Sequence, residues 1–260
     1  MNHILKILFF PINLFAKTIE GIGEYSILMA RIFRIRVNDK FFLSHLSEQI
    51  FNIGVASIPI VIFTSFFTGM VTSVQAIYQY ETTNLPSYYI GSVVGETILL
   101  ELGPMVTCLI MTGKVGATIA AEIGTMRVSE QIDALESLSY DPVPFLISPR
   151  VIASAIMFPV LIILADIFGI LGGIYACMKA IDISPDTFLL GLRGWFRPWD
   201  AWFGVIKGFS FGIAITSISC YKGFYTSGGA EGVGKSTTMA VIASCVAIIV
   251  IDWVLAEILL

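Results

Sequence analysis

Charged side chains are scarce in this 260-residue sequence. Asp, Glu, Lys and Arg make up 13% of it, whereas a typical soluble domain carries about 25%. Hydrophobic residues make up 56%, and the mean hydropathy is +0.86. The few polar residues that remain are not enough to cover a water-exposed surface. The composition therefore excludes a soluble enzyme and a disordered regulator, and it predicts a polytopic membrane protein.

Clustered metal ligands and an excess of basic residues are also lacking. The two histidines and four cysteines form neither a CxxC pair nor a Cys/His cluster. We therefore expect no metal site and no cofactor, and we interpret the cysteines as buried apolar residues. The net charge of −4 and the isoelectric point near 5.2 provide no basic surface for a phosphate backbone. A nucleic-acid partner is excluded on this ground.

Long apolar runs are the main positive feature. About 20 mostly apolar residues are enough to cross a bilayer, and five such runs occur. The second run contains Glu96 and Glu101, so hydropathy supports it least. The predicted fold is all-α, with an N-terminal helical segment over 1–45 and a membrane domain over 46–260. Its five transmembrane helices are expected at about 50–80, 88–112, 151–178, 201–221 and 237–260.

Lysine and arginine are distributed unevenly between the ends of these runs. With the N-terminus inside, eleven of them fall in the inner segments 1–50, 113–150 and 222–236, and three fall in the outer segments. Cytoplasmic loops carry an excess of Lys and Arg. We therefore expect a cytoplasmic N-terminus and a C-terminus on the outer side.

The first 45 residues are too interrupted to span a bilayer. Their apolar residues recur at helical spacing, and nearby lysines can face anionic headgroups. This pattern predicts a helix that lies in the inner membrane interface; an amphipathic segment that packs on the spans is the alternative. The apolar residues concerned are Leu5, Leu8, Phe9, Ile12 and Phe15.

A glycine-rich run, Gly229-Ala-Glu-Gly-Val-Gly-Lys-Ser236, matches the phosphate-loop pattern G-x-x-x-x-G-K-[ST]. A functional phosphate loop joins a buried strand to a helix in an α/β domain, but this run lies between the last two predicted spans. We therefore expect it not to bind ATP. The glycines predict a tight cytoplasmic turn, and the hydroxyl groups of 236–238 are candidate caps of the last helix.

The segment 122–138 has the pattern of a short amphipathic helix between two spans. Its apolar stripe consists of Val128, Ile132, Leu135 and Leu138. A helix lying on the membrane is one interpretation, but acidic residues are disfavoured at the negative inner leaflet. We favour a helix that docks on a cytoplasmic partner. Its candidate contact residues are Glu122, Arg127, Glu130, Gln131, Asp133 and Glu136.

Ionisable side chains inside a span face a cavity or a partner, because an isolated charge is unfavourable in hydrocarbon. Glu101, midway along the second span, is the main candidate for a substrate cavity, and Glu96 lies five residues before it. An ion pair inside the bundle, for instance with Lys207, is the alternative. The glycine pairs 91/95 and 208/212 allow close helix approach and are weak evidence for a dimer face.

Three runs resemble the signature motifs of the MlaE (YrbE-type) permease family. They are Ala121-Glu-Ile-Gly-Thr-Met-Arg-Val-Ser-Glu-Gln-Ile-Asp-Ala-Leu-Glu136, Glu101-Leu-Gly-Pro104, and Gly228-Gly-Ala-Glu-Gly-Val-Gly234 with Thr237-Thr238. The resemblance covers about 45–260 and makes 46–260 a permease domain. Leu100, a further candidate cavity position, departs from the family, in which many members have arginine before the E-L-G-P motif. The family often has arginine and alanine at the positions of Lys235 and Ser236, which argues against a phosphate loop.

The resemblance implies the membrane subunit of an ABC system that moves phospholipid or a related lipid, with no catalysis of its own. It implies a homodimer, cytoplasmic ATPase subunits docked on the helix at 122–138, and a lipid-binding MCE-domain protein on the outer side. A small STAS-type subunit is a further implied partner. The implied location is a bacterial inner membrane, or the inner envelope of a plastid.

Two other classes of protein compete with this interpretation. An ion- or proton-coupled secondary transporter would use Glu96, Glu101 and Lys207. An intramembrane enzyme would need a nucleophile–base pair or a metal constellation, and the sequence contains neither pattern.

Overall fold

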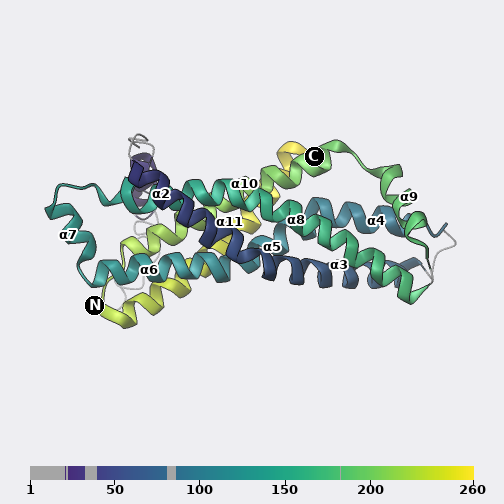
Figure 1. Ribbon diagram of the computed structural model, residues 1–260, viewed down its shortest axis with the longest axis horizontal. Coiled ribbons are helices and arrows are strands. Elements are labelled where there is room, and N and C mark those ends of the chain that lie inside the picture. The colour runs from purple at the N-terminus through teal and green to yellow at the C-terminus, as the bar shows by residue number, and fades with distance from the viewer. Residues whose placement is uncertain (1–20, 22, 33–39, 81–85, 182) are drawn as a thin grey trace, which may run out of the picture.

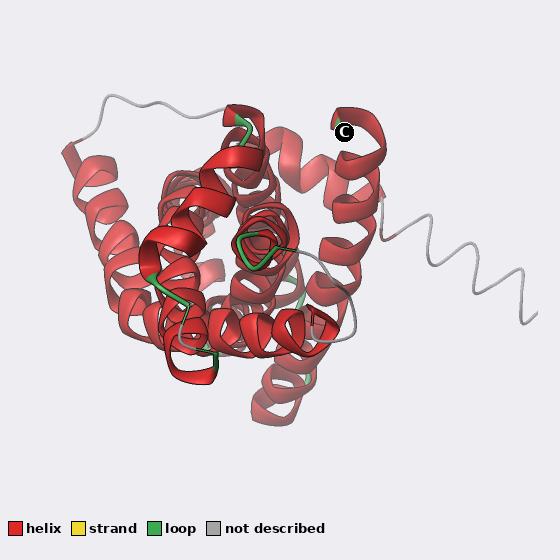
Figure 2. Ribbon diagram, turned by 90° about the vertical axis from the view of Figure 1, so that its right-hand side faces the viewer, coloured by secondary structure: helices red, strands yellow, loops and turns green. Residues whose placement is uncertain are grey.

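The computed structural model describes all residues except 1–20, 22, 33–39, 81–85 and 182. The described residues form helices joined by short turns, and they contain no strand (Figure 2). The prediction of an all-α membrane protein is confirmed. The interfacial helix predicted from Leu5 to Phe15 lies outside the described residues.

Five helices in the described ranges are long and apolar enough to cross a membrane, which confirms the predicted number. Each of them is longer than its predicted span. At 1.5 Å per residue, the 40-residue second helix is about 60 Å long, twice the hydrocarbon thickness of a bilayer. The five spans are Phe42–Gln79, Tyr89–Val128, Val143–Ala180, Pro198–Phe224 and Gly229–Leu259.

The first two spans are not continuous α-helices. The first consists of α2 (Lys40–Gln49), the π-helix η1 (Ile50–Gly54), the 3₁₀ turn η2 (Val55–Ser57) and α3 (Ile58–Tyr80). The second consists of α4 (Tyr89–Thr97), the π-helix η3 (Ile98–Leu102), α5 (Gly103–Met111), the π-helix η4 (Thr112–Gly116) and α6 (Ala117–Val128). Breaks of this kind leave backbone groups without their regular helical partners, so donors from elsewhere must satisfy them.

The rest of the described chain is helical as well. After α6 come α7 (Gln131–Ser137), the π-helix η5 (Val143–Ile147), α8 (Ser148–Ala180), α9 (Pro185–Trp195), α10 (Pro198–Phe224) and α11 (Gly229–Leu259). The short helix α9 lies in a segment that the hydropathy analysis left as a connection between spans. Its start has a local signal: the Ser184 hydroxyl caps the Thr187 N–H at 3.2 Å, and Pro185 follows the cap.

Glycines bring several helices into backbone contact. A Cβ atom built on Gly69 of α3 would lie 1.8 Å from the Gly169 carbonyl oxygen of α8, so only glycine permits this approach. The predicted glycine pairs behave in the same way, but within one chain. The 91/95 pair packs against α9, and the 208/212 pair packs against α8. Neither pair is therefore evidence for a dimer face.

The bundle is elongated, and its two ends differ (Figure 1). Helix α7 and the first described helix, over 23–32, lie at one end, while α9 lies at the opposite end. The helix over 23–32 packs on the bundle through Leu28 and Ile32, which are almost fully buried. A separate apolar cluster around Phe188 and Val94 joins α9 to α4, α3 and α8.

Candidate functional site

The second span is interrupted at Glu101-Leu-Gly-Pro104, where η3 meets α5. Proline has no N–H group, so Pro104 cannot donate to the Leu100 carbonyl four residues earlier, as an ordinary residue would in an α-helix. Lys207 of α10 replaces this donor: its Nζ lies 2.8 Å from the Leu100 carbonyl oxygen. The break in one span is thus closed by a lysine from another.

Lys207 is also the centre of an ion-pair cluster that joins three spans. Its Nζ lies 2.9 Å from a carboxylate oxygen of Glu101 and 2.7 Å from one of Asp252, on α11. The ring centroid of Phe203 lies 4.5 Å from the same ammonium group. The Lys207 side chain is fully buried, so the two carboxylates are necessary to keep a charged ammonium in this environment.

The members of this cluster differ in how far they reach the surface. The Glu101 side chain is 42% exposed, whereas that of Asp252 is 15% exposed. Glu101 is therefore the member of the cluster that a molecule outside the bundle can reach. The predicted alternative, an ion pair between Glu101 and Lys207, is present in the structure. The sequence favours a contact inside the bundle for Asp252, but it does not identify Lys207 as the partner, because no local pattern connects the two residues.

The other two candidate cavity residues have different surroundings. Glu96 is exposed on α4, and no ion pair joins it to any residue in the described ranges. Leu100 takes part in the Lys207 cluster through its backbone carbonyl group. A small cleft lies nearby between α3, η3, α5 and α8, and no charged side chain lines it. Its lining includes Ser65, Thr68, Ile98, Val106 and Thr107.

The segment predicted as one helix over 122–138 is divided into two. Helix α6 ends at Val128, and α7 begins at Gln131. Between them Glu130 has φ of 62°, a left-handed conformation that interrupts a right-handed helix. The single-helix prediction was wrong because the apolar spacing continues across a turn that changes the direction of the chain. Glu122 and Arg127 consequently belong to the end of the second span.

Helix α7 is anchored on one side and exposed on the other. Ile132 is fully buried and Leu135 packs against the main core, whereas Gln131, Asp133 and Glu136 are exposed. Exposed apolar side chains follow at the end of the helix, with Leu138 at 68% exposure. The apolar stripe thus continues beyond the buried anchor onto the surface.

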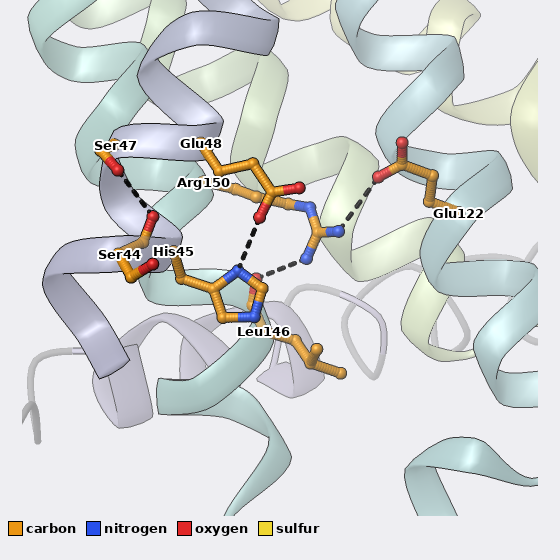
Figure 3. Close-up of polar contacts among 7 residues, drawn as sticks. All are labelled: Ser44, His45, Ser47, Glu48, Glu122, Leu146 and Arg150. Atoms are coloured by element: carbon orange, nitrogen blue, oxygen red, sulfur yellow. Dashed lines mark hydrogen bonds and ion pairs between the residues drawn. The ribbon is translucent and has the colours of Figure 1, made fainter. Parts of the chain in front are cut away.

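Three of the predicted docking residues make ion pairs within the chain. Arg127 contacts Asp133 at 2.6 Å. Glu122 contacts Arg150, at the start of α8, at 3.0 Å, and Arg150 also donates to the Leu146 carbonyl (Figure 3). The Arg150 side chain is 7% exposed, so this ion pair is partly buried. It joins the α7-side ends of the second and third spans. A separate pair between His45 and Glu48 of α2 is seen in the same view.

The glycine-rich run does not form a loop. Its residues make up the first two turns of α11, which begins at Gly229 immediately after the left-handed Gly228 (φ 93°). The predicted turn therefore lies at 228–229, and the predicted capping by 236–238 was wrong. The Thr237 and Thr238 hydroxyls donate to carbonyl groups four residues earlier within the helix. A helical backbone has few free N–H groups with which to surround a phosphate.

Comparison with known proteins gives a consistent result over most of the chain. The family described as Permease MlaE matches residues 46–258. A probable ABC transporter permease protein of Rickettsia bellii is 37% identical over 92% of each chain, and one of Synechocystis is 39% identical over 80% of this chain and 79% of its own. The chloroplastic protein TRIGALACTOSYLDIACYLGLYCEROL 1 of Arabidopsis thaliana is 37% identical over 81% of this chain and 60% of its own. The chain belongs to the MlaE permease family.

Proposed function

We propose that this chain is the membrane subunit of an ABC transporter that moves phospholipid or a related lipid, driven by a separate ATPase. Membership of a permease family and relatives named as ABC transporter permeases support a transport subunit. The observation that carries the proposal is α7, a short helix between two spans that is anchored through Ile132 and exposed on its other side. Such a helix is a suitable contact for a motor that the chain itself does not contain.

The surface of α7 favours a protein partner over the membrane. Its exposed side chains include Asp133 and Glu136, and carboxylates are repelled by anionic lipids. The exposed Leu138 offers an apolar contact beside them. We infer that ATPase subunits dock here, on the cytoplasmic side, which agrees with the excess of Lys and Arg predicted for this end.

The Lys207 cluster is the proposed polar part of the substrate path. Glu101 is the exposed member, and a small cleft without charged side chains lies nearby. The name of the chloroplast relative is that of a galactolipid, which supports a lipid as substrate. A secondary transporter that uses Glu96, Glu101 and Lys207 is the second candidate; ion-driven flux without ATP would favour it.

The assembly around the chain is also part of the proposal. One chain carries one α7, so a pair of ATPase subunits requires a homodimer. A lipid-binding MCE-domain protein would contact the α9 end, and a STAS-type subunit would bind the ATPase. The complex would lie in a bacterial inner membrane, or in a plastid inner envelope, with the N-terminus in the cytoplasm.

Docking on α7 is tested with two substitutions in the co-expressed complex. Glu136→Lys reverses an exposed charge that no intramolecular ion pair holds among the described residues, so the fold should remain and ATPase recovery on the purified permease should fall about tenfold. Asp186→Lys is the matched control, because it makes the same charge reversal at an exposed residue of α9, at the opposite end of the bundle, and should leave ATPase recovery unchanged. Normal ATPase recovery with Glu136→Lys would exclude this face as the docking site.

Lipid movement is tested with Glu101→Gln, which keeps the size of the side chain and removes its charge. We expect ATP-dependent lipid transfer in vesicles to fall at least about tenfold while the ATPase stays bound. Unchanged transfer would remove Glu101 from the substrate path. Transfer that continues without ATP but requires an ion gradient would favour the secondary transporter.

A further inference from the structure

The first span has a break that resembles the one at Lys207. Pro59 is the second residue of α3 and has no N–H to donate to the Ala56 carbonyl three residues earlier, in the 3₁₀ turn η2. A lysine of the neighbouring span supplies the donor here as well. Lys114 of η4 donates to the Ala56 carbonyl, and its Nζ lies 3.0 Å from the Ser57 hydroxyl.

The two lysines differ in their counter-charges. Lys207 is paired with two carboxylates, whereas no carboxylate of the described residues lies within ion-pair distance of Lys114. Its two observed partners are a carbonyl group and a hydroxyl group, and an ammonium has three N–H donors. Lys114 therefore has one donor and a full positive charge for which the described part of the chain provides no partner.

This donor lies at the surface of the bundle. Lys114 is partly exposed, and its neighbour Gly113 is exposed, with open space where a side chain would point. Across from it, Val55, Ala56 and Pro59 are exposed as well. A molecule that approaches from the membrane can therefore reach the ammonium group along an apolar surface.

Polar side chains continue from Lys114 toward the α7 end. Asn52 lies one turn before Ala56 on the first span, and Thr118 lies one turn after Lys114 on the second; both are exposed. The two spans run in opposite directions (Figure 1), so both residues lie on the same side of Lys114 along the bundle. Together these residues form a short polar track that leads away from the ammonium group.

The track leads toward the membrane surface. Glu122, which is exposed and paired with Arg150, lies eight residues after Lys114, or about 12 Å along the helix. The interfacial layer of a bilayer is about 5–7 Å thick on each side, and a lysine side chain extends toward it. Lys114 thus lies in the half of the second span that is nearer to α7, on the side from which lipid phosphates of that leaflet approach.

We propose that Lys114 binds the phosphate group of an anionic lipid, whose charge replaces the carboxylates found around Lys207. The phosphate accepts from the remaining Lys114 donor, with Asn52 and Thr118 beside its path. The acyl chains lie on the exposed apolar residues of α3, which include Ile60, Phe63 and Phe67. The site requires only that the chain lies in a membrane, so it does not depend on lipid transport.

The test measures lipid retention by the full-length permease in detergent, using native mass spectrometry. Phosphatidic acid and diacylglycerol with the same acyl chains are offered together, so only the phosphate differs. We expect the wild type to retain phosphatidic acid preferentially, Lys114→Met to bind it about tenfold more weakly, and Lys114→Arg to stay near the wild type. Lys235→Met, which removes an exposed lysine from α11, is the matched control and should change nothing.

Each result decides the proposal. Equal retention of the two lipids by the wild type would overturn it without any variant, and so would unchanged retention by Lys114→Met. Displacement of the lipid by inorganic phosphate would show a site for free phosphate and would overturn the lipid assignment. The measurement uses neither ATP nor a transport step, so its failure is distinct from a failure of the proposed transport function.

Discussion

Two breaks in the membrane helices of this protein are closed by lysines, and the two lysines lie in opposite environments. At Pro104 the donor is Lys207, fully buried and paired with Glu101 and Asp252. At Pro59 the donor is Lys114, partly exposed and without a carboxylate partner in the described part of the chain. In each case a proline provides no N–H for a nearby carbonyl group, but among the described residues only Lys207 has carboxylates that balance its charge.

The difference shows what each site can do. A buried ammonium that lost its carboxylates would be strongly unfavourable, so the Lys207 cluster ties η3, α10 and α11 together. An exposed ammonium needs no such fixed partner, because lipid headgroups or water can reach it. The break at Pro104 is therefore suited to holding the bundle together, and the break at Pro59 is suited to exchange with membrane lipids.

The largest effect is expected from Lys207→Met. The substitution leaves two carboxylates without their cation and the Leu100 carbonyl without a donor, and loss of one partner from a buried ion pair costs about 3–5 kcal/mol. We expect a correspondingly lower midpoint in denaturant unfolding of the detergent-solubilised permease. A shift as small as that of Lys114→Met would remove the contrast between the two breaks.

A double-mutant cycle with Pro104→Ala separates the backbone role of Lys207 from its ion pairs. Alanine restores an N–H group for the Leu100 carbonyl, so the loss of Lys207 should be less harmful in this background. We expect a coupling free energy of about 1 kcal/mol, typical of one hydrogen bond. Strict additivity in equilibrium unfolding would mean that Lys207 does not substitute for the proline's missing donor.

Lys114→Met should destabilise the protein by about 1 kcal/mol or less, because its hydrogen bonds lie at a partly exposed site. Phosphatidic acid should raise the melting temperature of the wild type, since a ligand that binds only the folded state stabilises it. It should not raise that of Lys114→Met. A lipid-dependent rise of the same size in the variant, seen by thermal unfolding in detergent, would contradict the assignment.

The smallest effect is expected from Lys114→Arg. Arginine keeps the charge and can donate to both the Ala56 carbonyl and a phosphate. Stability should stay within about 0.5 kcal/mol of the wild type, as for a surface substitution. A loss as large as that of Lys114→Met, measured by the same unfolding assay, would show that the shape of the ammonium group matters more than its charge.

Much of the architecture was predictable because it depends on local properties. The five spans follow from the length and hydropathy of each run, and a helix near 131–137 follows from periodic apolar residues. The division of 122–138 was not predictable, because the left-handed Glu130 is an ordinary residue with no local turn signal. The ion pairs of the proposed docking residues were not predictable either. Only the structure shows that Glu122 contacts Arg150 and that Arg127 contacts Asp133.

The sequence by itself determined the class of the protein and the number of its membrane helices, because the length and hydropathy of each apolar run are local properties. It did not determine where the helices are interrupted, since Pro159 lies within the continuous helix α8. Only the tertiary structure decided which lysine closes each break and whether carboxylates accompany it. Lys207 and Asp252 meet because α10 and α11 pack in one particular register. A shift of one turn, about 5.4 Å, would separate them, and no pattern within either helix specifies that register.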